Sequence, residues 1–374
     1  MSEQPTIFLA GGGTGGHLYP GVAVAQALRV AVPDVKAVFL CTEREIDKTI
    51  LEPTGFEFIP QPIVPPVLNI NGLVKFWRSW RETKDQVKHL LRQRRPAVVL
   101  GLGGYAAGLA VRVAAQRGIP TAIINPDAIP GKANQYLMRH VQAVCCQFEA
   151  TSQYVSAEQR GKLRVTGCPI RADIRDLPPR EQAVSRLMIK PELQTLVVTG
   201  ASQGAKTVNE AVVEMMKSIT LRGWQILHLS GKEHAESVRA GYRELELPAC
   251  VIDFTPAMAD VWAVADLVIS RSGASSCAEL TACGVPSILM PYPFHKDLHQ
   301  RANAKVLADA GAAVLLDDQR DRKANAKSLE PIVESLLYDL PKRQAMAGAA
   351  RALGKPDAAE SVARIITQIG SLVR

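Results

Sequence analysis

The chain alternates short, wholly apolar segments with helical segments, and it does so in two successive series. The first series reads TIFLA, KAVFLC, AVVLG, TAIIN and QAVCCQF, between residues 6 and 148. The second reads TLVVTG, WQILHLS, CVIDF, DLVIS, PSILMP and AAVLL, between residues 195 and 316. Continuously apolar strands are buried on both faces, and their alternation with helices indicates a parallel sheet covered on both sides. The sequence therefore predicts an α/β protein.

Two domains are expected, because 374 residues exceed what a single core usually supports. Each series opens with an apolar strand, a glycine-rich turn and a helix, in residues 7–28 and 196–216. The predicted fold class is thus two Rossmann-like, doubly wound parallel-sheet domains facing a central cleft. We expect an N-terminal domain over 1–168, a C-terminal domain over 169–345, and a helix within 346–374 that packs back on the N-terminal domain.

Composition limits the compartment and the kind of partner. Seven cysteines without a CxxC pair indicate neither a disulfide framework nor a zinc site, so a reducing compartment is expected. The N-terminus lacks the pattern of a signal peptide, and no window reaches the length of an apolar membrane span. A net charge of +8 favours an anionic partner, such as a nucleotide or a phospholipid surface.

Three glycine turns precede helices: GGGTGGH (11–17), GLGGYAAG (101–108) and GASQGAK (200–206). Helix N-termini offer unpaired N–H groups, and glycines let an anion approach them. Gly11, Gly13 and Gly16 also fit the dinucleotide pattern GxGxxG, although the acidic residue that it requires, Glu43, comes late. The third turn can equally be a plain tight turn. His17 is either a helix cap or, since histidine titrates near neutrality, a general base.

The most informative stretch is DLVISRSGASSCAELTACGVPSILMPYPFHKDLHQRANA, residues 266–304. In a doubly wound sheet, ligands bind at the carboxyl ends of the strands, where its SGASS turn and its polar segment 295–300 are expected. Small residues at the helix start would let a diphosphate reach backbone N–H groups, and Glu279 would accept hydrogen bonds from ribose hydroxyls. The alternative is a surface loop with an exposed glutamate.

Six motifs occur in the order and at the spacings of the MurG family of UDP-N-acetylglucosamine transferases, from about Ile7 to Asn303. They are GGGTGGHLYPGVAVAQAL, VVLGLGGYAAG, GCPIR, GASQGAKTVNE, RSGASSCAEL and HKDLHQRANA. The resemblance implies the GT-B fold and an inverting transfer of GlcNAc from UDP-GlcNAc to the muramoyl-pentapeptide on undecaprenyl diphosphate, in peptidoglycan synthesis. It implies no cofactor and no metal, and a peripheral position on the cytoplasmic face of the inner membrane.

Site residues follow from the resemblance, motif by motif. His17 is the implied catalytic base. The implied sugar-donor residues are Thr14, Gly15, Gly16, Asp127, Arg171, Ser202, Thr255, Ala274, Ser275, Ser276, Cys277, Ala278, Glu279 and Gln300. The implied acceptor residues are Gly13, His17, Gly103, Gly104, Tyr105 and Asn134.

One segment departs from the family pattern. Where the family has a His-Glu-Gln-Asn run, this chain reads IINPDAIPGKAN, so that Asn125 replaces the acidic residue and Asp127 replaces the asparagine. The departure favours, as an alternative, a related GT-B transferase that uses a nucleotide sugar on another lipid-linked acceptor. A nucleotide-sugar-binding protein without turnover and a dinucleotide oxidoreductase are the alternatives from other classes.

Residues 70–96 predict a basic helix with aromatic side chains. The segment holds eight lysines and arginines, two acidic residues and the aromatic residues Phe76, Trp77 and Trp80. Such a helix suits an anionic membrane surface. The alternative is a solvated helix with its aromatic residues in the core. Nucleic acid is not expected as a partner, because the basic residues gather in one segment without a nucleic-acid-binding motif.

Overall fold

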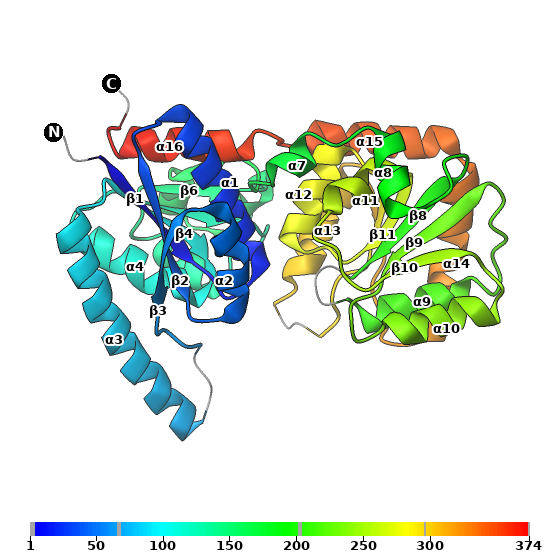
Figure 1. Cartoon of the computed structure of the whole chain (residues 1–374), viewed down its shortest axis with the longest axis horizontal. Helices are drawn as coiled ribbons and strands as arrows, with labels where there is room; N and C mark the ends of the chain where they lie inside the picture. Colours follow the sequence, from blue (N-terminus) through cyan, green and yellow to red (C-terminus); the bar gives the residue numbers. More distant parts are fainter. Residues whose placement is uncertain (1–3, 66–68, 201–203, 295–296, 373–374) are drawn as a thin grey trace. The chain divides into compact units, whose positions relative to one another are not determined.

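A computed structural model describes residues 4–65, 69–200, 204–294 and 297–372. The chain forms two compact units, and each is described by itself (Figure 1). Unit 1 comprises Met1–Arg171 with Pro356–Arg374, and unit 2 comprises Ala172–Lys355. The division between them falls after Arg171, where we expected it after residue 168. Residues 346–353, expected with the returning helix, are instead the end of α15 (Leu340–Leu353) in unit 2.

Unit 1 is built on a parallel sheet of seven strands in the order β3-β2-β1-β4-β5-β6-β7. The strands are β1 (Thr6–Gly11), β2 (Lys36–Thr42), β3 (Glu57–Gln61), β4 (Val98–Gly103), β5 (Thr121–Asn125), β6 (Ala143–Cys146) and β7 (Leu163–Val165). All five segments that the apolar pattern predicted are strands. The pattern missed β3 and β7, because these edge strands are short and carry polar or half-buried residues.

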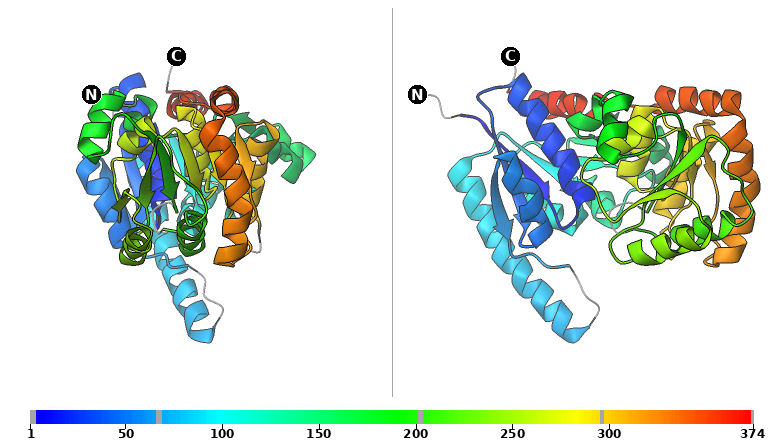
Figure 2. Two further views of the ribbon diagram at one scale, coloured as in Figure 1. Left: turned by 90° about the vertical axis from the view of Figure 1, so that its right-hand side faces the viewer. Right: turned by 45° about the vertical axis from the view of Figure 1, so that its right-hand side comes forward.

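Helices cover both faces of this sheet. They are α1 (Gly15–Ala31), α2 (Glu45–Leu51), α3 (Ile70–Arg94), α4 (Gly104–Gln116), α5 (Lys132–Leu137), α6 (Ala157–Arg160) and α16 (Ala358–Ile369). Alternate residues of β1 enter two cores, since Leu9 packs with residues of α1 and α16 and Phe8 with residues of α3, α4 and α5. The helix α3 extends past its sheet in both views of Figure 2.

Unit 2 has a parallel sheet of six strands in the order β10-β9-β8-β11-β12-β13. The strands are β8 (Gln194–Thr199), β9 (Trp224–Leu229), β10 (Ala249–Ile252), β11 (Leu267–Ser270), β12 (Ser287–Leu289) and β13 (Ala313–Leu315), each overlapping a predicted segment. Its helices are α7 (Ala172–Arg175), α8 (Arg180–Leu187), α9 (Lys206–Met215), α10 (Ala235–Glu244), α11 (Met258–Val264), α12 (Ala274–Cys283), α13 (His299–Asp309), α14 (Arg322–Tyr338) and α15. Residues of α9, α10 and α14 form one core with β8 and β9.

In both sheets the strand order changes direction between the strands that come first and fourth along the chain in that unit. In unit 1 this switch point lies between β1 and β4, and in unit 2 between β8 and β11. Ligands of doubly wound folds bind outside the carboxyl ends of the strands at this point. The glycine turns after β1 and β4, and the turns after β8 and β11, start there. The topology thus explains why three glycine turns and the SGASS turn mark candidate sites.

Candidate functional site

His17 stands in the first turn of α1, and its ring lies against the backbone of the second glycine turn. A Cβ atom built on Gly103 would lie 3.0 Å from His17 Cδ2, and one on Gly104 would lie 2.8 Å from His17 Cε1. Both glycines also have positive φ angles, 109° and 72°. Glycine at both positions therefore lets the imidazole approach the main chain, which accounts for the GG pair.

The surroundings of His17 keep its imidazole neutral near pH 7. The Nδ1 atom lies 3.1 Å from Thr14 Oγ1. Burial lowers the pKa of His17, and three smaller influences oppose it: a hydrogen bond to the backbone of Gly12, then the charge of Asp127, then that of Asp47. Because the pKa stays below 6.5, the ring is unprotonated at neutral pH and has a lone pair with which to accept a proton. A role as helix cap does not fit, since Thr14 is the N-cap residue.

A buried carboxylate, which the sequence analysis missed, anchors the first glycine turn. Asp47 on α2 accepts hydrogen bonds from Gly13 N at 2.7 Å, from Thr42 N at 2.8 Å and from Thr42 Oγ1 at 2.7 Å. A Cβ on Gly12 would lie 2.2 Å from Asp47 Oδ2, so this glycine is also required. The signal that could have found Asp47 is a carboxylate one turn after a strand that borders β1.

Tyr105 follows the second glycine turn and faces the first one. A Cβ on Gly13 would lie 3.5 Å from the Tyr105 hydroxyl oxygen. Burial raises the pKa of Tyr105, so the phenol keeps its proton at neutral pH. Unit 1 thus brings together the predicted residues Gly13, Thr14, His17, Gly103, Gly104 and Tyr105, with Gly15 and Gly16 opening α1 beside them.

The segment that departs from the family pattern forms its own hydrogen-bond network. Asn134 Nδ2 donates to Ile124 O at 3.0 Å and to Asn125 Oδ1 at 3.1 Å. Asn125 Nδ2 donates to the backbone oxygen of Asp127 at 2.8 Å. Asn125 and Asn134 are buried and therefore support the segment, whereas the charge of Asp127 acts on His17. Arg171, the last residue of this part of unit 1, stacks on the ring of Tyr19 of α1 at 5.2 Å.

In unit 2, α12 begins directly after the turn that follows β11. Its first residues are the predicted Ala274, Ser275 and Ser276, and the first N–H groups of an α-helix have no acceptor within the helix. Cys277 and Ala278 are buried behind them. Glu279 lies one turn further on, and its Oε2 accepts a hydrogen bond from Trp262 Nε1 at 2.8 Å, which orients the carboxylate.

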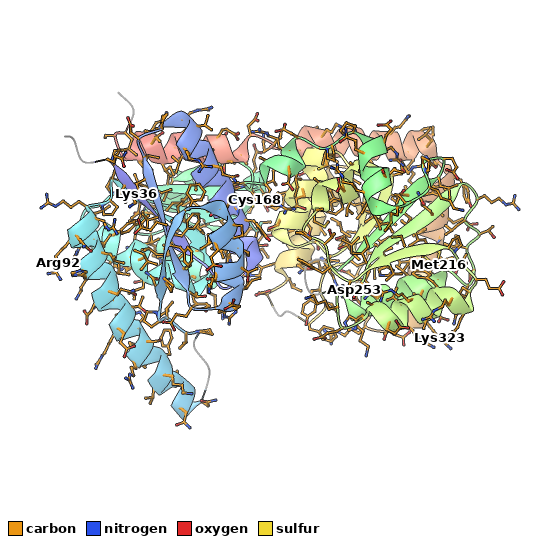
Figure 3. All side chains as sticks on the ribbon, in the orientation of Figure 1. Lys36, Arg92, Cys168, Met216, Asp253 and Lys323 are labelled. Carbon is orange, nitrogen blue, oxygen red and sulfur yellow. The ribbon has the colours of Figure 1, made fainter. Side chains whose placement is uncertain are left out.

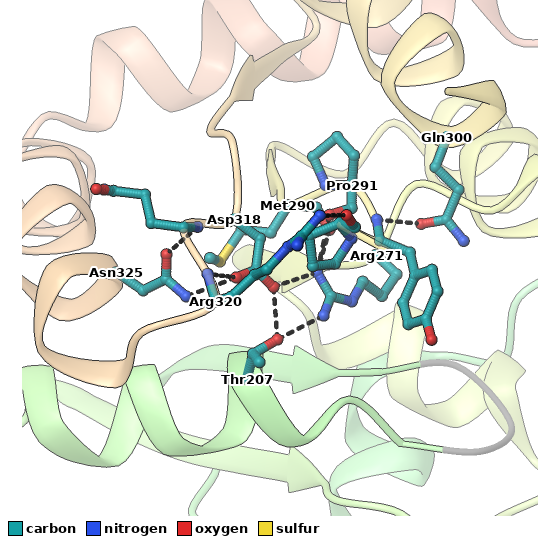
Figure 4. A network of polar contacts seen from close by, with 11 residues as sticks. Thr207, Arg271, Met290, Pro291, Gln300, Asp318, Arg320 and Asn325 are labelled. Carbon is teal, nitrogen blue, oxygen red and sulfur yellow. Dashed lines mark hydrogen bonds and ion pairs between the residues drawn. The ribbon is translucent and has the colours of Figure 1, made fainter. Parts of the chain in front are cut away.

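A buried ion pair, also missed, supports the loop after β12 (Figure 4). Arg271, 5% exposed, donates from Nη1 to the backbone oxygens of Met290 at 2.9 Å and Pro291 at 3.0 Å. The same nitrogen lies 2.8 Å from Asp318 Oδ2. Asn325 Nδ2 donates to Asp318 Oδ1 at 2.8 Å. The sequence signal was an arginine directly after a buried strand, in ISRSG.

Thr207 closes this network, because Arg271 Nη2 donates to its Oγ1 at 2.7 Å and its hydroxyl donates to Asp318. Burial opposes ionisation of Asp318, but hydrogen bonds from Thr207, Asn325 and the backbone of Arg320, with the charge of Arg271, hold its pKa below the usual value. The network therefore joins the start of α9, the end of β11 and the loops after β12 and β13.

Gln300 on α13 is held beside the same turn. Its Oε1 accepts a hydrogen bond from Tyr292 N at 2.9 Å (Figure 4). Its backbone oxygen accepts one from Ser272 Oγ at 2.8 Å. In unit 2, Gln300 is thus held next to the turn that precedes α12. Thr255 follows β10, where its Oγ1 accepts a hydrogen bond from Ala257 N at 3.0 Å. Ser202, together with His295 and Lys296, lies outside the described residues.

A second buried network lies beside the glycine turn that precedes α9. His228 Nε2 lies 3.0 Å from Asn209 Oδ1, and His228 Nδ1 lies 2.8 Å from the Tyr242 hydroxyl. Asn209 Nδ2 donates to Ser230 O, an oxygen that would lie 2.2 Å from a Cβ on Gly204. Asn209 therefore accepts from an Nε2–H tautomer of His228, and Tyr242 donates to Nδ1.

Acid is expected to destabilise the fold through His228. Burial lowers its pKa to about 3, against about 6.5 in the unfolded chain, so between these values only the unfolded chain binds the proton. Stability is unaffected above about pH 6.5 and falls as the pH drops below it, by about 2 kcal/mol between pH 7 and pH 5. Urea unfolding of the wild type and His228→Gln at both pH values measures this loss, which the variant should lack. Equal losses in the two proteins would contradict the assignment.

Among the residues that the structure describes, no group of three or more His, Cys, Asp or Glu side chains could hold a metal ion. In the same part of the chain, no helix combines the length and the apolar character that a membrane span requires.

Comparison with known proteins identifies both units. Residues 7–146 match the glycosyltransferase family 28 N-terminal domain, and residues 195–362 match the glycosyltransferase family 28 C-terminal domain. A protein of Desulforudis audaxviator is 36% identical over 97% of this chain and 98% of its own length. It is named UDP-N-acetylglucosamine–N-acetylmuramyl-(pentapeptide) pyrophosphoryl-undecaprenol N-acetylglucosamine transferase. A protein of Thermodesulfovibrio yellowstonii with the same name is 34% identical over 96% of this chain and 97% of its own length.

The fold agrees with these relatives. The crystal structure of Acinetobacter baumannii MurG superposes with a TM-score of 0.76 and 26% identity, covering 97% of this chain and 99% of that one. The predicted GT-B class, with two parallel-sheet α/β domains, is thereby confirmed. The chain therefore belongs to the MurG family within glycosyltransferase family 28, as the six sequence motifs predicted.

Proposed function

We propose that this glycosyltransferase moves GlcNAc from UDP-GlcNAc to a muramoyl-pentapeptide carried on undecaprenyl diphosphate. The observation that carries the proposal is a neutral imidazole, His17, seated on two glycines at the switch point of unit 1. The names of the relatives supply the substrates: each contains both the UDP-sugar and the lipid-linked acceptor.

The reaction is a single displacement at the anomeric carbon of the sugar. A hydroxyl oxygen of the acceptor forms the new bond to this carbon while its proton passes to His17. The bond to the diphosphate breaks, and UDP leaves with the electron pair. Because the diphosphate gains charge in the transition state, preset hydrogen-bond donors accelerate the step selectively.

Unit 2 would supply these preset groups. The first N–H groups of α12, at Ala274 to Ser276, suit the diphosphate, and Glu279 suits the ribose hydroxyls. Gln300 would hold the sugar hydroxyls, and Thr255 would meet uracil through its backbone. Arg171 and Ser202 would meet the nucleotide and its phosphates. Asp127, Thr14, Gly15 and Gly16 would complete the sugar-donor contacts, and Gly13, Gly103, Gly104, Tyr105 and Asn134 would face the acceptor.

A second candidate keeps the reaction and changes the acceptor. Compared with the family pattern, the carboxylate is at residue 127 and residue 125 is an asparagine, so the acidic group has moved by two positions. This difference favours the second candidate, because the charge of Asp127 acts on His17. In this case the chain would glycosylate another lipid-linked hydroxyl from the same nucleotide sugar.

Binding and turnover measurements separate the candidates. Calorimetric titration with UDP, UDP-GlcNAc and NAD should give binding of the first two and none of the third. Adding the muramoyl-pentapeptide lipid should then release UDP. Release with only a different polyprenyl-linked acceptor would support the second candidate, and UDP-GlcNAc binding without release on any acceptor would contradict both.

We further propose that α3 holds the enzyme on an anionic membrane, where such an acceptor resides. Val74 and Trp77 are 63% and 57% exposed. The ring centroids of Trp77 and Trp80 are 5.8 Å apart. Trp80 packs on the core, so one aromatic cluster connects the core with the surface. Exposed cations flank it, among them Lys75, Arg78 and Arg81; further along α3, Figure 3 shows Arg92 projecting outward. Apolar side chains within a basic surface suit insertion between anionic headgroups.

Removing the two exposed apolar side chains should weaken membrane binding. In the double variant Val74→Ser/Trp77→Ser, the free energy gained by burying apolar side chains in the headgroup region falls by roughly 2 kcal/mol or more. Partitioning to phosphatidylglycerol vesicles should therefore fall at least tenfold. Co-sedimentation measures the bound fraction. The control Val30→Ser, on α1 at 83% exposure, should bind like the wild type. This role of α3 would be contradicted if the double variant bound vesicles as the wild type does, or if vesicle binding did not depend on the content of anionic lipid.

A further inference from the structure

Asp47 is a buried carboxylate to which the proposed reaction assigns no task. Its side chain is 0% exposed, and its hydrogen bonds come from three neutral groups, Gly13 N, Thr42 N and Thr42 Oγ1. Burying a charge is costly unless the fold arranges hydrogen bonds around it. A carboxylate at this position therefore calls for a function that an apolar side chain could not fulfil.

The partners of Asp47 and of His17 belong to one peptide group. Asp47 accepts from the N–H of Gly13, at 2.7 Å and 2.9 Å from its two oxygens. The backbone of Gly12 raises the pKa of His17 through a hydrogen bond, and the Gly12 carbonyl is the other end of the same peptide group. In a planar trans peptide the C=O and N–H bonds point in opposite directions. The carboxylate and the imidazole thus lie on opposite sides of the Gly12–Gly13 peptide.

We propose that Asp47 is a positioning residue for His17 and acts on it through the Gly12–Gly13 peptide group. A carboxylate at the N–H end polarises the group and makes the carbonyl a stronger acceptor, since consecutive hydrogen bonds reinforce one another. The ring nitrogen that faces this carbonyl then keeps its proton. The other ring nitrogen keeps the lone pair that accepts the proton of the acceptor hydroxyl. The inference rests on the proposed role of His17 as base.

The turn is built so that this peptide cannot rotate. A Cβ on Gly12 would lie 2.2 Å from Asp47 Oδ2, so only glycine allows the carboxylate to come so close. On the far side of Gly13, Arg44 Nη1 donates to the Gly13 carbonyl at 3.1 Å and holds the next peptide group. Two consecutive peptide groups are thus fixed from α2 and from the residue that precedes it.

The charges around His17 come from several elements of unit 1. Asp127 approaches from the segment after β5, and Asp47 from α2. Arg44 and the phenol of Tyr105 lie near Gly13, and Arg44 acts on Tyr105 electrostatically. Both carboxylates raise the pKa of His17 against the larger effect of burial. Removing either charge is therefore expected to lower this pKa further.

The test compares Asp47→Asn with the wild type and with the control Asp34→Asn, which changes an exposed aspartate of unit 1. The amide has one acceptor oxygen for three donor groups, so the Gly12–Gly13 peptide loses its carboxylate. NMR titration of the His17 ring in the full, ligand-free chain should show a lower pKa and a changed tautomer ratio. Under saturating UDP-GlcNAc and lipid acceptor, kcat should fall at least tenfold with KM for UDP-GlcNAc within twofold. Asp47→Glu should restore part of kcat.

An unchanged His17 titration with unchanged kcat in a folded Asp47→Asn would overturn the proposal. If that variant does not fold, Thr42→Val tests the proposal instead, because it removes the hydroxyl that donates to Asp47 and keeps the Asp47 carboxylate. A shifted His17 titration in Thr42→Val supports the proposal, and an unchanged one overturns it. The titration needs no substrate, so a wild type that transfers no GlcNAc would refute the proposed function and leave this test intact.

Discussion

Replacing His17 by alanine is expected to reduce the rate of GlcNAc transfer by about a thousandfold, within the range that general bases contribute. The side chain is the neutral imidazole that lies on Gly103 and Gly104, and it is able to take a proton at neutral pH. Binding of UDP should be unchanged, because His17 is not among the groups proposed to hold it. Radiolabelled transfer measures the rate, and calorimetry measures the binding.

His234→Ala serves as the matched control, since this histidine precedes α10 and has no assigned role. The control should keep the wild-type rate. The wild type should also keep its activity to a lower pH than an imidazole with the usual pKa of 6.5 would allow, because the pKa of His17 is lowered. A rate for His17→Ala within tenfold of the wild type would remove His17 from the role of base.

Replacing Asp318 by alanine is expected to cost about 3 kcal/mol of folding stability, the lower end for breaking a buried ion pair. The change leaves the buried guanidinium of Arg271 without its carboxylate and takes away the acceptor of Asn325 and Thr207. The loop after β12, which Arg271 holds through Met290 and Pro291, should loosen as well. We therefore also expect a raised KM for UDP-GlcNAc. Urea unfolding and steady-state kinetics measure the two effects.

The neighbouring aspartate gives a control of the same chemistry. Asp317 pairs with Arg301 at 2.9 Å, but both side chains are about half exposed, at 60% and 46%. Exposed pairs contribute little, so Asp317→Ala should cost less than about 1 kcal/mol. Equal losses of stability in the two variants would show that the network of Figure 4 is not the element that supports this loop.

The sequence was sufficient to predict the fold because the central strands are apolar on both sides. All eleven predicted segments contain strands, and the two sheets place β1 and β8 at equivalent positions. The edge strands β3 and β7 escaped prediction for the opposite reason. Pro60 interrupts the apolar pattern of β3, and β7 has only three residues, two of them exposed.

The candidate site was predictable where a motif lies in one continuous segment. The ring of His17 and the turn at Gly103–Gly104 were both marked by glycines, although their contact depends on how β1 and β4 pair. Supporting residues were not predictable in this way. Asp47 and Asp318 act on residues that are 34 and 47 positions away in the chain, Gly13 and Arg271, and the place of an aspartate relative to a strand does not tell which distant residue it contacts.

The helix α3 carries side chains that fit each of the two sequence interpretations. Trp80 packs on the core of unit 1, as the structural reading required, whereas Trp77 is 57% exposed, as a membrane-binding surface requires. Helical periodicity could not separate the two residues, because they lie three positions apart and so on nearly one face. The two residues differ only in whether the core of unit 1 reaches them, and this depends on the tertiary structure.

Transfer of labelled GlcNAc to purified muramoyl-pentapeptide undecaprenyl diphosphate is the most direct test of the central claim, because it examines the sugar donor and the acceptor together. The proposed function predicts one labelled disaccharide lipid and one UDP per turnover, with His17→Ala inactive beside an active His234→Ala. UDP-GlcNAc that binds to the wild type but never appears in the lipid product would contradict it.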